Sequence, residues 1–109
     1  MQNHESSQPL VSVGMPVYNG SAFIRVAIDS ILNQTFTDFE LVISDNASED
    51  DTQQICEQYV ASDPRVKFSR VDENLGVMPN FNRVWELSSG KYFKWASHDD
   101  WISPRYLEQ

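Results

Sequence analysis

Phe39-Glu-Leu-Val-Ile-Ser44 runs directly into Asp45-Asn-Ala-Ser-Glu-Asp-Asp-Thr52, and this junction decides the fold class. The first six residues have a continuous apolar centre, which is expected of a strand covered on both faces of its sheet. The eight residues that follow are polar and rich in acids. Within them, Ser48 and Asp51 have the spacing of a helix capping box. The junction therefore predicts a buried strand, a polar loop and then a helix.

The same alternation extends towards the amino end of the chain. Residues 10–15 predict an apolar strand that Pro16 stops, followed by a turn at Asn19-Gly20. A helix is expected over residues 21–34, with Ser21 as its N-cap. Its apolar face has three- and four-residue spacing and comprises Ile24, Ala27, Ile28, Ile31 and Leu32.

Towards the carboxyl end, the helix after Thr52 is expected to end at Asp63-Pro64. Residues 66–71 alternate apolar and polar, which predicts a half-exposed edge strand. A third helix is expected from near Pro79. The apolar positions of these two helices are Ile55, Cys56, Tyr59 and Val60 in the first, and Phe81, Val84 and Trp85 with Ser88 in the second.

The last strand lies in Lys91-Tyr-Phe-Lys-Trp-Ala-Ser-His-Asp-Asp-Trp101, an apolar run that ends on two adjacent carboxylates. We expect this strand to be buried. Adjacent acids oppose each other's ionisation, and a cation reached by both Asp99 and Asp100 relieves that cost. Oxygen ligands suit Mg²⁺ or Mn²⁺. An equally good interpretation is that Asp100 caps a helix that begins near Pro104.

Four strands and three helices in alternation predict an α/β fold with a mostly parallel sheet, flanking helices and the order βαβαβαβ. Such sheets bind ligands outside the carboxyl ends of their strands, where the strand order reverses. Polar residues cluster after every predicted strand. Because these clusters should converge on one rim, we expect a site there, formed by Tyr18-Asn19, Asp45-Asn46-Ala47-Ser48, Asp72-Glu73-Asn74 and Asp99-Asp100.

The composition limits the partners. The chain has 109 residues, enough for one domain, and a net charge of −8, which argues against nucleic acid and anionic lipid as partners. Residues 1–9 are polar and are expected to form a flexible leader, not a signal peptide. No apolar run approaches the roughly 20 residues of a membrane span. The single cysteine, Cys56, falls among apolar helix positions and is expected to be a buried, inert thiol. One cysteine allows no disulfide within the chain, which suits a reducing compartment, so we expect a cytoplasmic protein.

Two nucleotide-binding signatures are missing. The first predicted strand is followed neither by Gly-x-Gly-x-x-Gly nor by a P-loop. A phosphorylated ligand would then be held through a metal at Asp99 and Asp100, which could also stabilise a leaving diphosphate.

Four motifs, in order, resemble the family 2 glycosyltransferases of the GT-A fold. They are Val-Ser-Val-Gly-Met-Pro-Val-Tyr-Asn (11–19), Asp-Asn-Ala-Ser-Glu-Asp-Asp-Thr (45–52), Asn-Leu-Gly (74–76) and Ser-His-Asp-Asp (97–100). The intervening residues 31–41 are also similar to that family. The likeness extends over residues 10–109 and implies the nucleotide-sugar-binding (donor) part of such an enzyme, which would end before the acceptor half.

The resemblance implies roles for single positions. Pro16, Tyr18 and Asn19 match the loop that packs around the nucleotide base. Asp45 matches the first acid of the family's Asp-Asp pair, and Asn46 stands where the second acid usually meets the base.

Later positions match as well. Asn74, Gly76 and Asn82 resemble the segment that leads to the Asp-x-Asp-type signature, in which Ser97 replaces the first acid. Asp99 would contact the ribose or the metal, and Asp100 is favoured as the metal ligand. His98 is more readily explained as a neighbour than as a ligand.

The activity implied is an inverting, metal-dependent transfer of a sugar from a nucleoside-diphosphate sugar, most readily a UDP-sugar, to a hydroxyl. The acceptor would be a saccharide or lipid-linked molecule in polysaccharide or glycoconjugate synthesis, and the metal Mn²⁺ or Mg²⁺. The general base is expected beyond residue 109. A sheet expected to continue past its fourth strand leaves an edge and apolar surface uncovered, so we expect self-association. Alternatives are a nucleotidyltransferase and a non-catalytic nucleotide-binding or interaction module with the same fold.

Overall fold

The computed structural model describes residues 9–35 and 37–96. Four strands alternate with three helices in the described residues, which confirms the predicted order. The elements are β1 (Val11–Val17), α1 (Ile24–Leu32), β2 (Phe39–Asp45), α2 (Thr52–Ser62), β3 (Val66–Arg70), α3 (Val77–Leu87) and β4 (Tyr92–Trp95).

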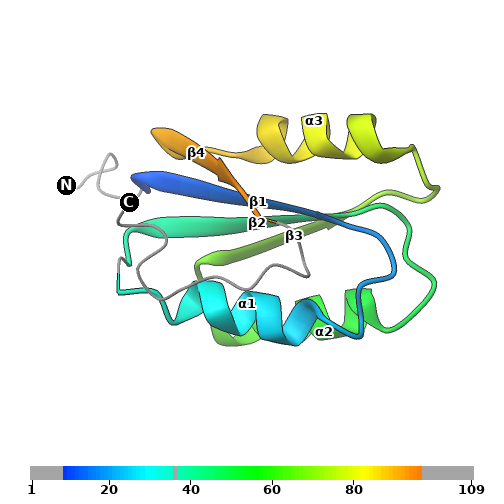
Figure 1. Cartoon of the computed structure of the whole chain (residues 1–109), viewed down its shortest axis with the longest axis horizontal. Coiled ribbons are helices and arrows are strands. Elements are labelled where there is room, and N and C mark those ends of the chain that lie inside the picture. Colours follow the sequence, from blue (N-terminus) through cyan, green and yellow to red (C-terminus); the bar gives the residue numbers. More distant parts are fainter. Residues whose placement is uncertain (1–8, 36, 97–109) are drawn as a thin grey trace.

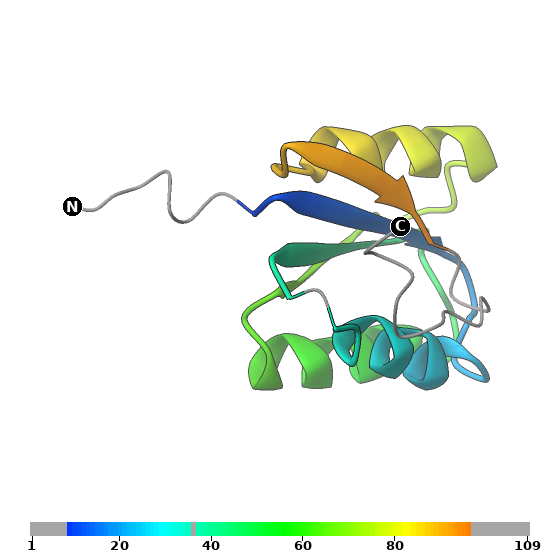
Figure 2. The same ribbon diagram turned by 60° about the vertical axis from the view of Figure 1, so that its left-hand side comes forward.

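All described strand pairs are parallel, in the order β3-β2-β1-β4. Helices α1 and α2 cover one face of this sheet and α3 lies on the other (Figures 1 and 2). Every residue of β2 is buried, as its continuous apolar centre predicted for a strand covered on both faces. The main core lies between the sheet and α1 and α2. Its fully buried members include Val13, Met15, Ile24, Ile28, Leu41, Ile43 and Cys56.

Strand β1 continues through Pro16 to Val17, so the prediction that Pro16 stops it is wrong. Gly14 accepts a hydrogen bond from Ala96 on the β4 side, and Val17 accepts one from Asn46 on the β2 side. Because successive residues of a strand point to alternate neighbours, the nitrogen of Pro16 faces the β4 side, beyond the last paired residue of β4. The next rung of this ladder would run from the nitrogen of residue 16 to the Ala96 carbonyl, so the proline gives up one hydrogen bond at the end of β4.

Both predicted helix caps are wrong. Helix α1 begins three residues after Ser21, and no side chain caps it. Neither Ser48 nor Asp51 caps α2, which begins at Thr52. Instead, Asp50 accepts a hydrogen bond from the Thr52 nitrogen at 3.0 Å. The serines are used in contacts between loops, which are described below.

Strand β3 is an edge of the sheet, as its alternation predicted. At the other edge of the described sheet, β4 is not buried, because Tyr92 is 61% exposed and Trp95 42%. Among the described elements β4 pairs with β1 and has α3 beside it, which leaves part of the strand exposed, so its apolar composition did not mean burial. Cys56 is fully buried, as expected. Burial, with the charges of Asp45 and Glu57, raises the pKa of its thiol to about 12.

No helix in the described part of the chain combines the length and apolar character that crossing a bilayer requires. The predicted leader, apart from Pro9, and everything from Ser97 onwards lie outside the described residues. Those include His98, Asp99, Asp100 and the helix expected near Pro104.

Candidate functional site

The candidate site lies at the carboxyl ends of the strands. Three loops meet at this end of the sheet (Figure 1): the first loop (residues 18–23, after β1), the second loop (46–51, after β2) and the third loop (71–76, after β3). The strand order reverses between β1 and β4, because α3 leads the chain from one edge of the sheet to the far side of β1. Parallel α/β sheets place their ligand sites at such a reversal.

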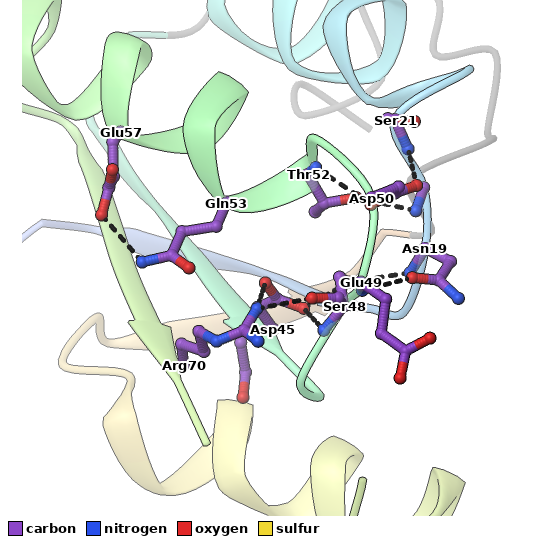
Figure 3. Close-up of polar contacts among 12 residues, drawn as sticks. Asn19, Ser21, Asp45, Ser48, Glu49, Asp50, Thr52, Gln53, Glu57 and Arg70 are labelled. Atoms are coloured by element: carbon purple, nitrogen blue, oxygen red, sulfur yellow. Dashed lines mark hydrogen bonds and ion pairs between the residues drawn. The ribbon is translucent and has the colours of Figure 1, made fainter. Parts of the chain in front are cut away.

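Asp45, the last residue of β2, is fully buried and paired. Its Oδ1 accepts hydrogen bonds from the Ser48 nitrogen at 3.0 Å and the Ser48 hydroxyl at 2.5 Å. Its Oδ2 accepts one from Arg70 Nη1 at 3.1 Å, and the same nitrogen donates to the Ser48 carbonyl at 2.9 Å (Figure 3). A buried carboxylate needs such partners, so in this structure Asp45 fixes the path of the second loop.

Ser48 and Asn19 join the second loop to the first. The Asn19 nitrogen donates to Ser48 Oγ at 2.8 Å, and Asn19 Oδ1 accepts from the Glu49 nitrogen at 2.8 Å (Figure 3). Asn19 has a φ of 52°, in the left-handed region that asparagine tolerates better than most residues. The reciprocal pair of hydrogen bonds holds it in that conformation.

Asp50 and Thr52 add a second set of contacts between these loops. Asp50 Oδ2 accepts from the Ser21 nitrogen at 3.0 Å, and Thr52 Oγ1 accepts from the Gly20 nitrogen at 2.9 Å. The Thr52 hydroxyl in turn donates to Asp50 Oδ1 at 2.5 Å. Burial raises the pKa of Asp50, but the hydrogen bonds from Thr52 and Ser21 outweigh it and hold that pKa well below its usual range.

Asn46 joins the second loop to the third. Its Nδ2 donates to Asn74 Oδ1 at 2.8 Å and to the Gly76 carbonyl at 3.1 Å, and its Oδ1 accepts from the Leu75 nitrogen at 2.8 Å. Asn74 Oδ1 also accepts from the Gly76 nitrogen at 2.8 Å. The second loop therefore holds both of its neighbours.

Side chains that remain open to solvent at this rim include two large apolar ones. Tyr18 is 42% exposed and Leu75 44% exposed, while Pro16 is half-buried. The rim also contains Ala47, with a φ of 65°. Strained backbone of this kind concentrates at functional sites.

The structure thus brings together most predicted site residues: the rim includes Pro16, Tyr18, Asn19, Asp45, Asn46, Asn74 and Gly76. Asn82 lies within α3, at an exposed position. Arg70 was not among the predicted site residues, although the alternation of β3 indicates it. Arg70 shares its face with Val66 and Phe68, towards the core, and an arginine on an inward face requires an acid partner.

No metal site is present in the described residues, where no three His, Cys, Asp or Glu side chains are grouped as ligands. Asp45, the carboxylate that ends β2, already has both oxygens bonded. The described side chains therefore do not by themselves fit a metal ion, and the predicted ligands Asp99 and Asp100 lie outside the described residues.

The fold and the rim define a parallel α/β domain of the class that binds ligands at the carboxyl ends of its strands. The family model described as Glycosyl transferase family 2 matches residues 12–109. The chain belongs to this family, as its motifs predicted.

Curated relatives agree with the family. The chain is 39% identical over 100 residues to a chondroitin synthase of Escherichia coli, covering 92% of this chain and 14% of that protein. It is 36% identical over 101 residues to the putative glycosyltransferase EpsH of Bacillus subtilis, covering 93% of this chain and 29% of that protein. The chain therefore spans 14% and 29% of the lengths of these two relatives.

Solved structures confirm the GT-A type of fold. Staphylococcus aureus TarS (residues 1–349), solved in complex with UDP, superposes with a TM-score of 0.83 and 30% identity, covering 90% of this chain and 30% of that one. The mannosyltransferase PcManGT of Pyrobaculum calidifontis, solved with GDP-Man and Mn²⁺, superposes with a TM-score of 0.79 and 23% identity. The match covers 89% of this chain and 29% of that one. The second likeness concerns the fold alone.

Proposed function

We propose that this chain binds the nucleoside-diphosphate part of a sugar donor at the rim formed by the three loops. In the whole protein, this binding would serve transfer of the sugar to an acceptor hydroxyl with inversion at the anomeric carbon. The observation that carries the proposal is the second loop, which is hydrogen-bonded to the first and third loops at the carboxyl ends of β1, β2 and β3. The first of these loops follows β1, the strand beside which the strand order reverses. Family membership supports it, as do the complexes of TarS with UDP and UDP-GlcNAc.

The first loop would receive the base. Tyr18 presents a partly exposed ring beside Pro16, and aromatic rings stack on bases. Asn19 would fix the position of this ring through its bonds to the second loop. The third loop, with Asn74 and Gly76, would form the opposite wall, and we favour a UDP-sugar as the donor.

The diphosphate needs positive charge, which an acidic chain does not supply on average. We propose that Asp100, with Asp99, holds a Mn²⁺ or Mg²⁺ ion there, and that Asp99 also contacts the ribose. When bound, this ion would neutralise the diphosphate and stabilise it as a leaving group. The loops of the rim would contribute positioning of the donor.

The reaction would be completed outside residues 1–109. We propose a saccharide or lipid-linked acceptor, a general base in an acceptor-binding part of the whole protein, and a role in polysaccharide or glycoconjugate synthesis. We also propose a cytoplasmic location, because the single cysteine, Cys56, is a buried free thiol and suits a reducing compartment.

Calorimetry tests the proposal. UDP with Mn²⁺ should bind the wild-type chain, Asp100→Ala should abolish the metal-dependent part, and Tyr18→Ala should weaken binding about tenfold, because stacking on one base contributes roughly 1–3 kcal/mol. Tyr92→Ala is the matched control, since Tyr92 is also exposed but lies at the start of β4. Equal affinity of UDP for wild type and Tyr18→Ala would contradict the assigned role of Tyr18. If neither UDP nor GDP bound, the proposed function would be wrong.

A further inference from the structure

The side chain of Asn46 has almost no hydrogen-bonding capacity left for a ligand. Both Nδ2 protons are donated within the protein, to Asn74 Oδ1 and to the Gly76 carbonyl, and Oδ1 already accepts from the Leu75 nitrogen. The residue is 4% exposed. An amide has two donors and two acceptor positions, so a single lone pair on Oδ1 remains unused by these bonds.

The orientation of this amide is fixed by groups that cannot exchange roles. The Leu75 nitrogen can only donate and the Gly76 carbonyl can only accept. Asn74 Oδ1 is held as an acceptor by the Gly76 nitrogen. Asn46 therefore faces two acceptors and one donor, a set that matches an amide. A carboxylate at this position would place negative charge against the two acceptors.

We propose that Asn46 is a positioning residue that locks the third loop onto the second, and that it does not read the nucleotide base. This inference rests on the proposed function for its consequence in donor binding. The lock also accounts for asparagine at the position where the motif resemblance would place a second acid. Discrimination between bases then falls to other groups of the rim.

Asn46→Asp turns the lock into a pH-sensitive one. Burial and the two facing acceptors raise the pKa of the new carboxyl in the folded chain above its usual value of about 3.9. The protonated acid can still donate one hydrogen bond and accept from Leu75, so the variant should be close to wild type near a pH of about 4. Stability should fall as the pH rises from there towards the raised pKa, because only the unfolded chain ionises freely.

Amide hydrogen exchange reports on the lock without any ligand. At a pH of about 7, the protection factor of the Leu75 amide should fall about tenfold or more in Asn46→Asp, relative to wild type at the same pH. Asn46→Ala should lower it at every pH. Asn33→Asp is the matched control, because Asn33 is exposed at the end of α1, and it should change neither the protection of Leu75 nor its pH dependence. Identical pH profiles for Asn46→Asp and Asn33→Asp would overturn the proposal.

Nucleotide binding then separates positioning from reading. Uracil and cytosine present different donors and acceptors on the same edge, so a residue that reads this edge changes the ratio of UDP to CDP affinity when it is removed. Asn46→Ala should weaken both nucleotides by the same factor and leave the ratio unchanged. A changed ratio would overturn the proposal. If the wild type bound no nucleotide, the proposed function would fail, while the exchange of the Leu75 amide would still decide whether the lock exists.

Discussion

At the scale of single residues, each polar side chain that ends β2 or begins the second loop bonds a different part of the molecule. Asp45 pairs with Arg70 on β3, Asn46 holds the third loop, and Ser48 holds the first. Buried polar groups are stable only when they are bonded. The close spacing of these residues therefore reflects three separate attachments made by one short segment.

Asp50 gives the clearest prediction at this scale. Asp50→Asn should destabilise the chain by about 1 kcal/mol at neutral pH, because it weakens the bonds from Ser21 and Thr52 that position the start of α2. The lowered pKa of Asp50 means that its ionised form contributes stability above about pH 4 and loses it as the pH falls further. Urea unfolding of both proteins across this acid range measures the effect.

Asp51→Asn is the control for that prediction. It removes the same charge one residue later, from a side chain that caps nothing at α2. The difference between wild type and Asp50→Asn should shrink as the pH falls, whereas Asp51→Asn should stay close to wild type throughout. A gap between wild type and Asp50→Asn that persists at low pH would show that the Asp50 carboxylate is not the stabilising group.

Sequence spacing assigned several of these residues to the right region but to the wrong partners. Ser21 and Ser48 were predicted as local helix caps, since capping rules consider only neighbours within one turn. Ser48 does bond nearby Asp45, but the contacts that join the loops link Ser21 to Asp50 and Ser48 to Asn19, each pair 29 residues apart in the sequence. Contacts of that range depend on how β1 and β2 pair, which no local pattern contains.

At the scale of elements, the apolar patterns of β2 and β3 predicted their places in the sheet, whereas the apolar run of β4 did not predict its exposure. The uninterrupted apolar centre of β2 and the alternation of β3 gave the central and edge positions that the sheet shows. Boundaries were less predictable, because they depend on neighbours. Pro16 can continue β1 because its nitrogen faces the β4 side, where the ladder between β1 and β4 is ending and one hydrogen bond is lost.

Gly14 of β1 allows α3 and β4 to pack closely on the sheet. A Cβ at this position would lie 2.3 Å from Val84 Cγ1 and 2.5 Å from Phe93 Cζ. Overpacking of a core typically costs about 1–3 kcal/mol, so Gly14→Ala should lower the free energy of unfolding by about that amount. Urea unfolding monitored by circular dichroism measures the loss.

A double-mutant cycle with Val84→Ala isolates the cause. Val84 is fully buried, so Val84→Ala alone should cost about 2 kcal/mol through lost packing. In the presence of Gly14→Ala, the smaller residue at position 84 relieves part of the clash, so the double variant should be more stable than the sum of the two losses indicates. Strictly additive losses would show that Gly14 and Val84 do not interact.

At the scale of the whole molecule, the two faces of the sheet differ. Helices α1 and α2 bury one face, whereas α3 is the one helix of the described residues on the other (Figure 2). Beside α3, an aromatic cluster joins that helix to β4 and comprises Phe81, Trp85, Phe93 and Trp95, with neighbouring ring centroids 4.6–5.2 Å apart. Trp85 is 60% exposed although its spacing predicted the apolar face of a helix. Periodicity identifies an apolar face but not what covers it.

The exposed aromatic cluster should make the chain self-associate, an outcome also expected from the sequence, where an uncovered sheet edge and apolar surface were the reasons. Adjoining exposed aromatic rings favour burial against another apolar surface, while a net charge of −8 on every copy opposes contact. Salt screens that repulsion, with a Debye length that falls from roughly 30 Å at 0.01 M to roughly 8 Å at 0.15 M. Association measured by sedimentation velocity should therefore strengthen as the salt concentration rises.

Trp85→Lys tests whether the aromatic cluster is the surface responsible. The substitution adds a positive charge, which by itself reduces repulsion between copies, so weaker association in this variant can come only from the lost aromatic surface. Val60→Lys adds the same charge on α2, where Val60 is 40% exposed, and should associate at least as strongly as wild type. A wild-type chain that stays monomeric at every concentration and salt level, or a Trp85→Lys variant that associates as Val60→Lys does, would contradict this role of the cluster.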